Sequence, residues 1–190
     1  MSENSKKSIG KPTVADLVLT AMFSVIIAVC AWITVPSVIP FTLQTFGVFL
    51  CLGLLGGRRG TVSVLVYILL GLVGVPVFSG FKGGIAAVLG PTGGYIIGFV
   101  GSALIYWLIT KLTNDKLYIQ AVSFVIGLAV CYAFGTVWFV EVYSAKVEPV
   151  GYAAALSMCV IPFIIPDLIK IALALVLIRL VKPKIKYFDK

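Results

Sequence analysis

Residues 17–57 have the sequence LVLTAMFSVIIAVCAWITVPSVIPFTLQTFGVFLCLGLLGG, a run of 41 positions without a charged side chain. A transmembrane helix needs about 20 apolar residues, so this run is long enough for two. Pro36 and Pro40 lie near its middle, where they disfavour one continuous helix. The run therefore predicts two successive helices that each cross a membrane.

The composition of the whole chain also indicates a membrane protein. Of its 190 residues, 61% are hydrophobic and 12% are charged, whereas soluble domains contain about 25% charged residues. There is no histidine, and the cysteines at 30, 51, 131 and 159 are far apart without Cys-x-x-Cys spacing. We therefore expect no metal site, no cofactor and no histidine-dependent catalysis, and we expect the thiols to be small buried apolar groups.

Further uncharged stretches extend the pattern to six helices. We expect an all-α integral membrane protein with helices at 14–35, 41–55, 61–77, 93–110, 118–140 and 160–181. Six spans of about 20 residues use about 120 positions, which leaves too few for a soluble domain. Residues 1–190 are thus predicted to form a single membrane domain, a bundle at 14–181 with basic ends at 1–12 and 182–190.

The basic residues test this count independently, because cytoplasmic loops and ends carry an excess of Lys and Arg. With the N-terminus inside, twelve of the fifteen fall on the inner side: Lys6, Lys7, Lys11, Arg58, Arg59, Lys111, Lys116, Arg179, Lys182, Lys184, Lys186 and Lys190. Lys82 and Lys146 fall outside, and Lys170 lies within the sixth span. Both termini are therefore predicted to be cytoplasmic, in a protein that crosses a membrane several times. No nucleic-acid-binding module is recognisable.

The connection between the third and fourth helices is rich in glycine and proline. It includes Pro76–Gly84 and Gly90–Tyr95, which cannot form regular helix. Because the segment is also apolar, we expect it to fold back to membrane depth, where irregular backbone must be buried in protein or line a cavity. Its peptide groups would then approach a ligand. The alternative is a plain connector whose glycines allow close helix contacts.

Two ionisable residues, Asp167 and Lys170, lie within the sixth helix at spacing i, i+3, which places them on one face. Each costs about 2.5–3.5 kcal/mol at the membrane midplane, so both must point into the protein. There they would meet each other or a ligand. The alternative is an ion pair that only holds helices together.

Other unusual residues lie in the same outer half of the predicted bundle. Thr42 and Gln44 open the second helix with polar groups that need partners inside the protein. In the fifth helix, Cys131, Gly135 and Trp138 recur on one face, with Tyr132 and Phe139 on an adjoining strip. This face predicts an aromatic wall for a flat ring, although Trp138 also suits an interfacial aromatic belt.

These groups together predict the chemistry of a ligand. Asp167 offers acceptors for N–H groups, whereas Lys170 and Lys82 offer positive charge for a carboxylate. A neutral ring with N–H donors and a carboxylate tail would satisfy all of them. We expect Lys82 to face the tail, and Lys170 to face a ring carbonyl or to fix Asp167.

The sequence resembles the BioY family over about residues 14–181. The resemblance is carried by Pro40–Phe46, Gly74–Gly80, Gly90–Tyr95 with Gly98 and Phe99, and Pro166–Asp167 with Lys170. It implies a six-helix substrate-binding S component of an energy-coupling factor (ECF) transporter for biotin. It also implies that Asp167 and Lys170 bind biotin, and that the loop at Lys82, Gly83 and Gly84 closes the site together with Tyr95.

The resemblance further implies three partner subunits: a transmembrane coupling subunit and two ATP-binding cassette subunits. S components typically contact the coupling subunit through an Ala-x-x-x-Ala pattern on the first helix, but here Ala21 is followed by Val25. Thr20, Ser24 and Ala28 form a ridge of small residues that could serve close packing instead.

Three other functions fit parts of the pattern. An S component for another vitamin would share the six helices. A small oligomeric channel would need polar residues along a whole helix, whereas only the outer half is polar here. An intramembrane enzyme would need a nucleophile and a base, and the spans hold neither a histidine nor a second carboxylate. We therefore expect a transport protein and not an enzyme.

Overall fold

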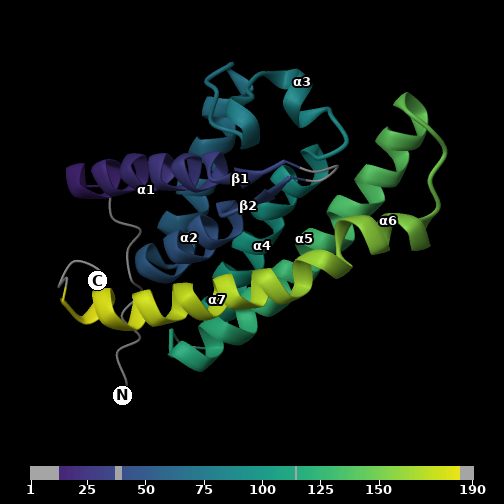
Figure 1. The fold of residues 1–190 in the computed structure, drawn as a ribbon. Coiled ribbons are helices and arrows are strands. Elements are labelled where there is room, and N and C mark those ends of the chain that lie inside the picture. The colour runs from purple at the N-terminus through teal and green to yellow at the C-terminus, as the bar shows by residue number, and fades with distance from the viewer. Residues whose placement is uncertain (1–12, 37–39, 114, 185–190) are drawn as a thin grey trace.

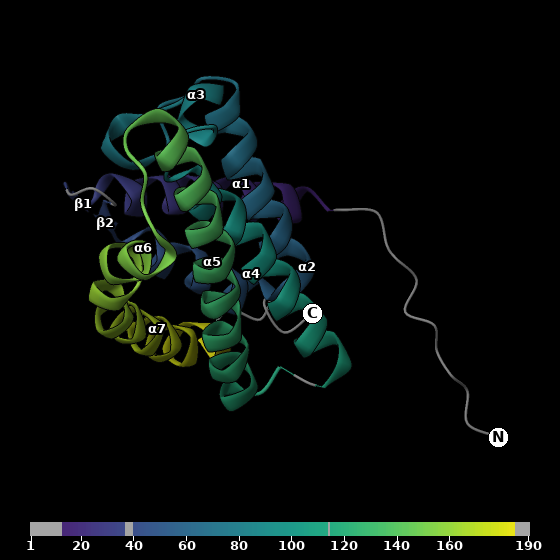
Figure 2. The ribbon, with the colours of Figure 1, turned by 90° about the vertical axis from the view of Figure 1, so that its right-hand side faces the viewer.

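The structure is a computed structural model that describes residues 13–36, 40–113 and 115–184. Its helices are α1 (Val14–Trp32), α2 (Gln44–Leu72), α3 (Ile85–Val88), α4 (Gly93–Leu112), α5 (Leu117–Lys146), α6 (Tyr152–Cys159) and α7 (Ile161–Val181). Two short strands, β1 (Thr34–Val35) and β2 (Phe41–Thr42), and two 3-10 turns, η1 (Ser79–Phe81) and η2 (Lys182–Lys184), complete the described elements. Figure 1 shows the start of α1 and the end of α7 on the same side of the bundle, and Figure 2 gives the perpendicular view.

Helix α2 consists of two halves joined at Gly56, where φ is 78° and ψ is 171°. The Gly60 carbonyl accepts a contact from the Cys51 thiol at 3.9 Å, and the Gln44 amide donates to the Tyr67 hydroxyl at 2.9 Å. These pairs show that residues 44–55 and 57–72 run antiparallel and touch each other. The second and third predicted helices are therefore both present. In the described chain, five helical stretches are long and apolar enough to cross a membrane when α2 is counted once.

Helices α4 and α5 approach each other closely because small residues line their interface. The contacting pairs, with the α4 residue first, are Gly94 with Trp138, Tyr95 with Gly135, Gly98 with Cys131 and Ser102 with Gly127. The Ser102 hydroxyl also donates to the Gly127 carbonyl at 2.6 Å. Helix association inside a membrane depends on such close packing and on interhelical hydrogen bonds. Cys131, Gly135 and Trp138 of α5 therefore pack against α4, whereas Tyr132 and Phe139 of the adjoining strip line cavities.

The first connection differs from its prediction. Helix α1 ends at Trp32 and not at Val35, and Thr34–Val35 pair with Phe41–Thr42 as a two-stranded antiparallel ladder. Pro36 disfavours a helical conformation in the residue before it, which explains the extended Val35. The second predicted helix accordingly begins at Gln44 and not at Phe41.

The fifth helix and the segment before the sixth differ as well, whereas the sixth helix itself, α7, ends at Val181 as predicted. Helix α5 continues past Glu141 to Lys146, since a charge at the end of a span reaches water and does not stop a helix. The short helix α6 was not predicted. It is separated from α7 at Val160, where φ is −123° and ψ is −57°, just before Pro162 in the first turn of α7.

The ridge of small residues on α1 packs inside this chain. Ser24 and Ala28 are buried, and the Ser24 hydroxyl donates to the Ser63 carbonyl of α2 at 2.9 Å. The exposed face of α1 instead carries larger apolar residues, among them Val18, Met22 and Val25. Ser24 and Ala28 are therefore unavailable to a partner, whereas Thr20 is half-buried.

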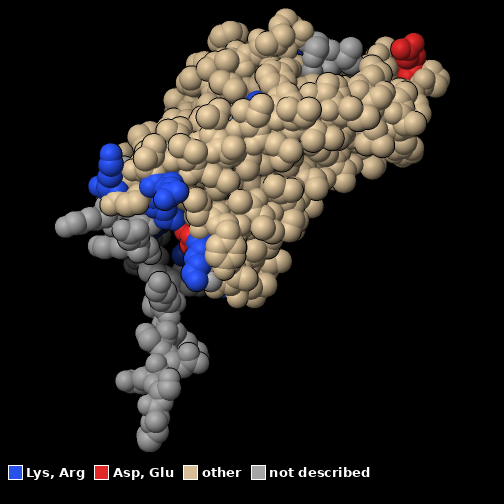
Figure 3. All heavy atoms as spheres, turned by 60° about the horizontal axis from the view of Figure 1, so that its bottom comes forward, with Lys and Arg blue, Asp and Glu red and all other residues tan. Residues whose placement is uncertain are grey.

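Charged contacts gather at the end where α1 starts and α7 finishes. Asp16 of α1 pairs with Arg59 beside the α2 turn at 2.7 Å. Asp115, between α4 and α5, pairs with Lys182, whose ammonium also donates to the Gly53 carbonyl at 3.3 Å. Figure 3 shows most of the visible basic side chains at this end, with an acidic group among them, and acidic side chains at the opposite tip. Arg59 and Lys182 thus lie at the predicted inner end, whereas Lys6, Lys7, Lys11, Lys186 and Lys190 of that prediction lie outside the described residues.

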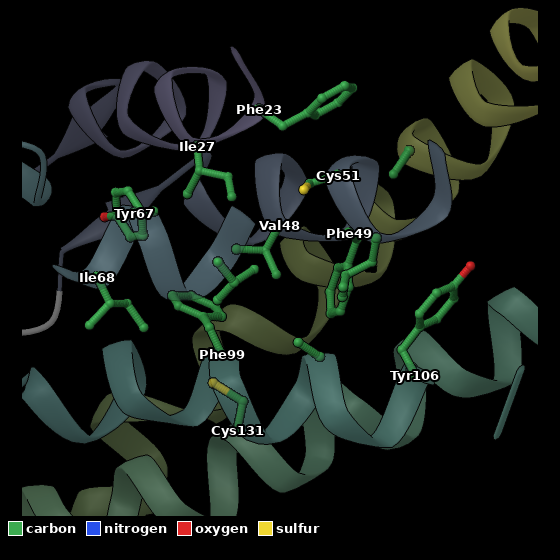
Figure 4. Packing of buried hydrophobic residues seen from close by; sticks show 14 of the residues in the cluster. Phe23, Ile27, Val48, Phe49, Cys51, Tyr67, Ile68, Phe99, Tyr106 and Cys131 are labelled. Atoms are coloured by element: carbon green, nitrogen blue, oxygen red, sulfur yellow. The ribbon is translucent and has the colours of Figure 1, made fainter. Parts of the chain in front are cut away.

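The core lies where α1, α2, α4 and α5 meet. Figure 4 shows Ile27 of α1, Val48 and Phe49 of α2 and Phe99 of α4 in one buried cluster. Phe124 of α5 extends it, with its ring 4.8 Å from that of Phe49. The four cysteines are buried with free thiols, as predicted.

The α2 turn gives a stability prediction. A methyl group at Gly56 would meet no atom within 4 Å, but the positive φ of 78° disfavours any L side chain. We expect Gly56→Ala to lower the free energy of unfolding by about 1–3 kcal/mol, seen as a lower melting temperature in detergent. Gly151 is the matched control, because it is equally open but has φ −80°. Equal shifts for Gly56→Ala and Gly151→Ala would contradict this explanation.

Candidate ligand-binding site

The centre of the site is an ion pair within α7. Asp167 and Lys170 are 3% and 4% exposed, and their carboxylate Oδ1 and ammonium Nζ are 2.7 Å apart. Pro166 precedes the pair inside the helix. Its missing N–H leaves a carbonyl of the preceding turn without its helical partner. The two charges face the protein interior, as the sequence predicts.

Two other elements complete the surroundings of this pair. The Tyr132 hydroxyl of α5 donates to Asp167 Oδ2 at 2.5 Å. The Lys170 ammonium donates to the Thr42 carbonyl of β2 at 2.6 Å and lies 4.0 Å from the centre of the Phe41 ring. Each N–H bond of the ammonium thus has a neighbour, and each carboxylate oxygen accepts one hydrogen bond. The geometry fits Lys170 as the residue that fixes Asp167, the second of its two predicted roles.

Two adjoining cavities lie next to the pair. The smaller, about 70 Å³, is lined by Pro40, Thr42, Thr45, Tyr95, Phe99, Leu128, Cys131, Tyr132, Cys159, Phe163, Asp167 and Lys170. The larger, about 250 Å³, is lined by Pro40, Thr42, Gln44, Phe78, Ser79, Lys82, Ala87, Pro91, Thr92, Ile96, Phe139 and Tyr143. Pro40 and Thr42 belong to both walls, so an elongated ligand could extend from one cavity into the other.

Five predicted site residues line these cavities besides Asp167. Lys170 and Tyr95 border the smaller cavity, Gln44 and Lys82 the larger, and Thr42 both. Lys82 is exposed at the loop, and its ammonium makes no hydrogen bond or ion pair with any residue that the structure describes. This cation is therefore available to a ligand.

Three predicted residues support the loop and do not line either cavity. Gly84 has φ 86° and donates its N–H to the Gly71 carbonyl at 2.6 Å. A methyl group at Gly83 would meet the Val75 carbonyl at 2.5 Å. The Trp138 indole donates to the Gly90 carbonyl at 3.0 Å, next to the cavity residues Pro91 and Thr92. These residues hold the loop that forms part of the larger cavity wall.

One contact of Tyr132 was not predicted from the sequence, its hydrogen bond to Asp167. The sequence placed it beside the predicted aromatic face, but a tyrosine in an apolar helix gives no sign of what its hydroxyl meets. Ser79, Thr92 and Tyr143 of the larger cavity were missed as well. For the tyrosines of α5, the sequence feature that could have indicated a role was a hydroxyl group within an apolar helix, because such a group needs a hydrogen-bond partner inside the protein.

The arrangement suits noncovalent binding of a ligand that has N–H donors at one end and an anionic group at the other. Asp167 keeps a lone pair on each oxygen beyond the bonds to Tyr132 and Lys170. Lys82 supplies a positive charge at the larger cavity. Within the described residues, no group of three or more metal-ligating side chains occurs.

The ion pair gives a stability prediction that does not depend on a ligand. Lys170→Met would leave the Asp167 carboxylate buried without its cation, which costs about 3–5 kcal/mol in buried pairs. We expect a clear fall in melting temperature for Lys170→Met, and partial recovery in the double variant Lys170→Met with Asp167→Asn. A melting temperature of Lys170→Met equal to that of the wild type would contradict a stabilising role of the pair.

Comparison with known proteins identifies the family. Residues 2–187 match the model of the BioY family. A biotin transporter BioY of Thermotoga maritima is 39% identical over 173 residues, which cover 90% of this chain and 98% of that protein. A probable biotin transporter BioY of Pyrococcus horikoshii is 39% identical over 163 residues, 85% of this chain and 93% of that protein.

A solved structure agrees with the sequence comparison. It is the crystal structure of an S-component for biotin from an ECF-type ABC transporter, with a TM-score of 0.78 and 27% identity over 96% of this chain and 95% of that one. Its fold is thus shared across nearly the whole length of both chains. On these grounds the chain belongs to the BioY family and has the S-component fold.

Proposed function

We propose that this protein binds biotin with high affinity and acts as the substrate-specific S component in its ATP-driven uptake. The observation that carries the proposal is the match to a biotin transporter over 98% of that relative's length. The similarity therefore covers a whole transporter chain and not one shared segment. The protein is a multi-pass membrane transport component and not an enzyme.

The site supports this ligand. Biotin combines a cyclic urea, which has two N–H donors, with a carboxylate on a flexible chain. Asp167, which is 3% exposed and lines the smaller cavity, would accept an N–H of the ring there. The chain would then extend past Thr42 into the larger cavity, where Lys82 offers its charge to the carboxylate.

Transport needs energy from other subunits. The glycine-rich stretch at 90–94 lacks the Gly-Lys-Ser/Thr sequence of a phosphate-binding loop. We therefore propose a transmembrane coupling subunit and two ATP-binding cassette subunits as partners. Biotin would bind from the outer side of the plasma membrane. The basic residues at the end that carries Arg59 and Lys182 support a cytoplasmic location for both termini.

Titration of the purified protein with a panel of vitamins tests the proposal. Saturable binding of biotin with the highest affinity in the panel is the expected result. Stronger binding of a different vitamin would assign the chain to another substrate. Ion flux into liposomes that contain this chain alone would instead favour a channel.

Asp167→Asn tests the proposed acceptor. The amide keeps the volume of the side chain but loses the negative charge that strengthens N–H···O bonds. Because hydrogen bonds to charged groups contribute about 1.5–3 kcal/mol, we expect biotin affinity to fall about tenfold to hundredfold in calorimetric titrations. Asp115→Asn, at the opposite end of the bundle, is the control. Unchanged affinity of Asp167→Asn would leave the Asp167–Lys170 pair with a structural role only.

The direction of the ligand is tested with biotin amide, which lacks the carboxylate charge. We expect the wild type to bind the amide more weakly than biotin, because Lys82 loses its anionic partner. The Lys82→Met variant should bind both ligands about equally, whereas Lys170→Met should still distinguish them. The reverse result would place the tail at Lys170 and the ring near Lys82.

A further inference from the structure

Asp167 accepts a hydrogen bond from a residue on helix α5 that is distant from it in the sequence. Tyr132 belongs to α5, and its hydroxyl donates to Asp167 Oδ2 at 2.5 Å. This distance is at the short end of the range for hydroxyl bonds to an ionised carboxylate. The other oxygen, Oδ1, accepts from Lys170. The two carboxylate oxygens are therefore held from α5 and α7.

A second donor matters because the terminal torsion of a carboxylate is soft. Rotation about this torsion has a broad energy minimum, so a single donor on Oδ1 would leave the carboxylate plane poorly defined. Donors on both oxygens fix that plane. Each oxygen then keeps one lone pair in a defined direction for a ligand.

Lys170 does not supply this second constraint. Its ammonium donates to Asp167 Oδ1 and to the Thr42 carbonyl, and it faces the Phe41 ring. Among the described residues, Tyr132 is the one that holds Oδ2. Its backbone is well fixed, because the adjacent Cys131 packs against Gly98 of α4.

We propose that Tyr132 is a positioning residue: its hydroxyl holds the Asp167 carboxylate in the orientation that accepts a ligand N–H. This inference rests on the proposed function, in which Asp167 accepts a hydrogen bond from biotin. Tyr132 acts through Asp167. Removal of its hydroxyl should therefore matter only when the carboxylate is present.

A double-mutant cycle tests this dependence. Biotin dissociation constants are measured for the wild type, Tyr132→Phe, Asp167→Asn and the double variant. We expect Tyr132→Phe to weaken binding about tenfold in the wild type and by less than about twofold when Asp167 is already Asn. Tyr106→Phe is the matched control, because the Tyr106 hydroxyl also donates to a carboxylate, Asp115 Oδ1, at 3.0 Å. It should leave biotin affinity unchanged.

Two outcomes of the cycle would overturn the proposal. Unchanged affinity of Tyr132→Phe would show that its hydroxyl does not position the acceptor. An equal loss in both backgrounds would show that Tyr132 acts independently of Asp167. Thermal melting verifies that each variant is folded, and Asp167→Ser provides the second background if Asp167→Asn does not fold.

Infrared spectroscopy of the ligand-free protein separates this inference from the proposed function. With isotope-labelled aspartate, the carboxylate band that disappears on substitution of Asp167 should shift in Tyr132→Phe and stay in place in Tyr106→Phe. An unshifted band would overturn the positioning role. Failure of the wild type to bind biotin, together with a shifted band, would refute the substrate assignment and leave the positioning role intact.

Discussion

Asp167 and Lys170 each carry a charge that a membrane interior disfavours by about 2.5–3.5 kcal/mol, so the surrounding structure must compensate for both. The compensation comes from three parts of the chain. Helix α7 supplies the pair itself, α5 supplies the Tyr132 hydroxyl, and β2 supplies the Thr42 carbonyl and the Phe41 ring. The site can exist only while these three elements remain together.

The sequence predicted the long helices and the buried pair because both depend on simple physical signals. Uncharged runs of sufficient length indicate spans, and an ionisable pair inside a span must face the protein. The break at Gly56 was also placed between two predicted helices. Arg59 and Lys182, two of the basic residues predicted on the inner side, occupy the expected end of the bundle.

Other features depend on contacts between distant segments, which one sequence does not specify. The pairing of Thr34–Val35 with Phe41–Thr42 and the separate helix α6 were missed for this reason. Trp138 was expected at the ligand, but its indole bonds to the Gly90 carbonyl. Tyr132 was expected on the adjoining aromatic strip, but the bond of its hydroxyl to Asp167 was not. Both are aromatic residues of one apolar helix, and only the register of α5 against its neighbours distinguishes them.

The close contact of α4 with α5 has a consequence for how the ligand preference of this fold could change. Gly98 and Gly127 leave no room for a larger side chain, since a methyl group there would lie 2.9 Å from the Cys131 sulfur and 3.2 Å from Ser102. Enlarging either residue would separate the helices before it reshaped the cavities. Evolution or engineering towards another substrate therefore has more freedom at cavity-lining positions outside this interface, such as Phe163 of α7 and Ala87 of α3.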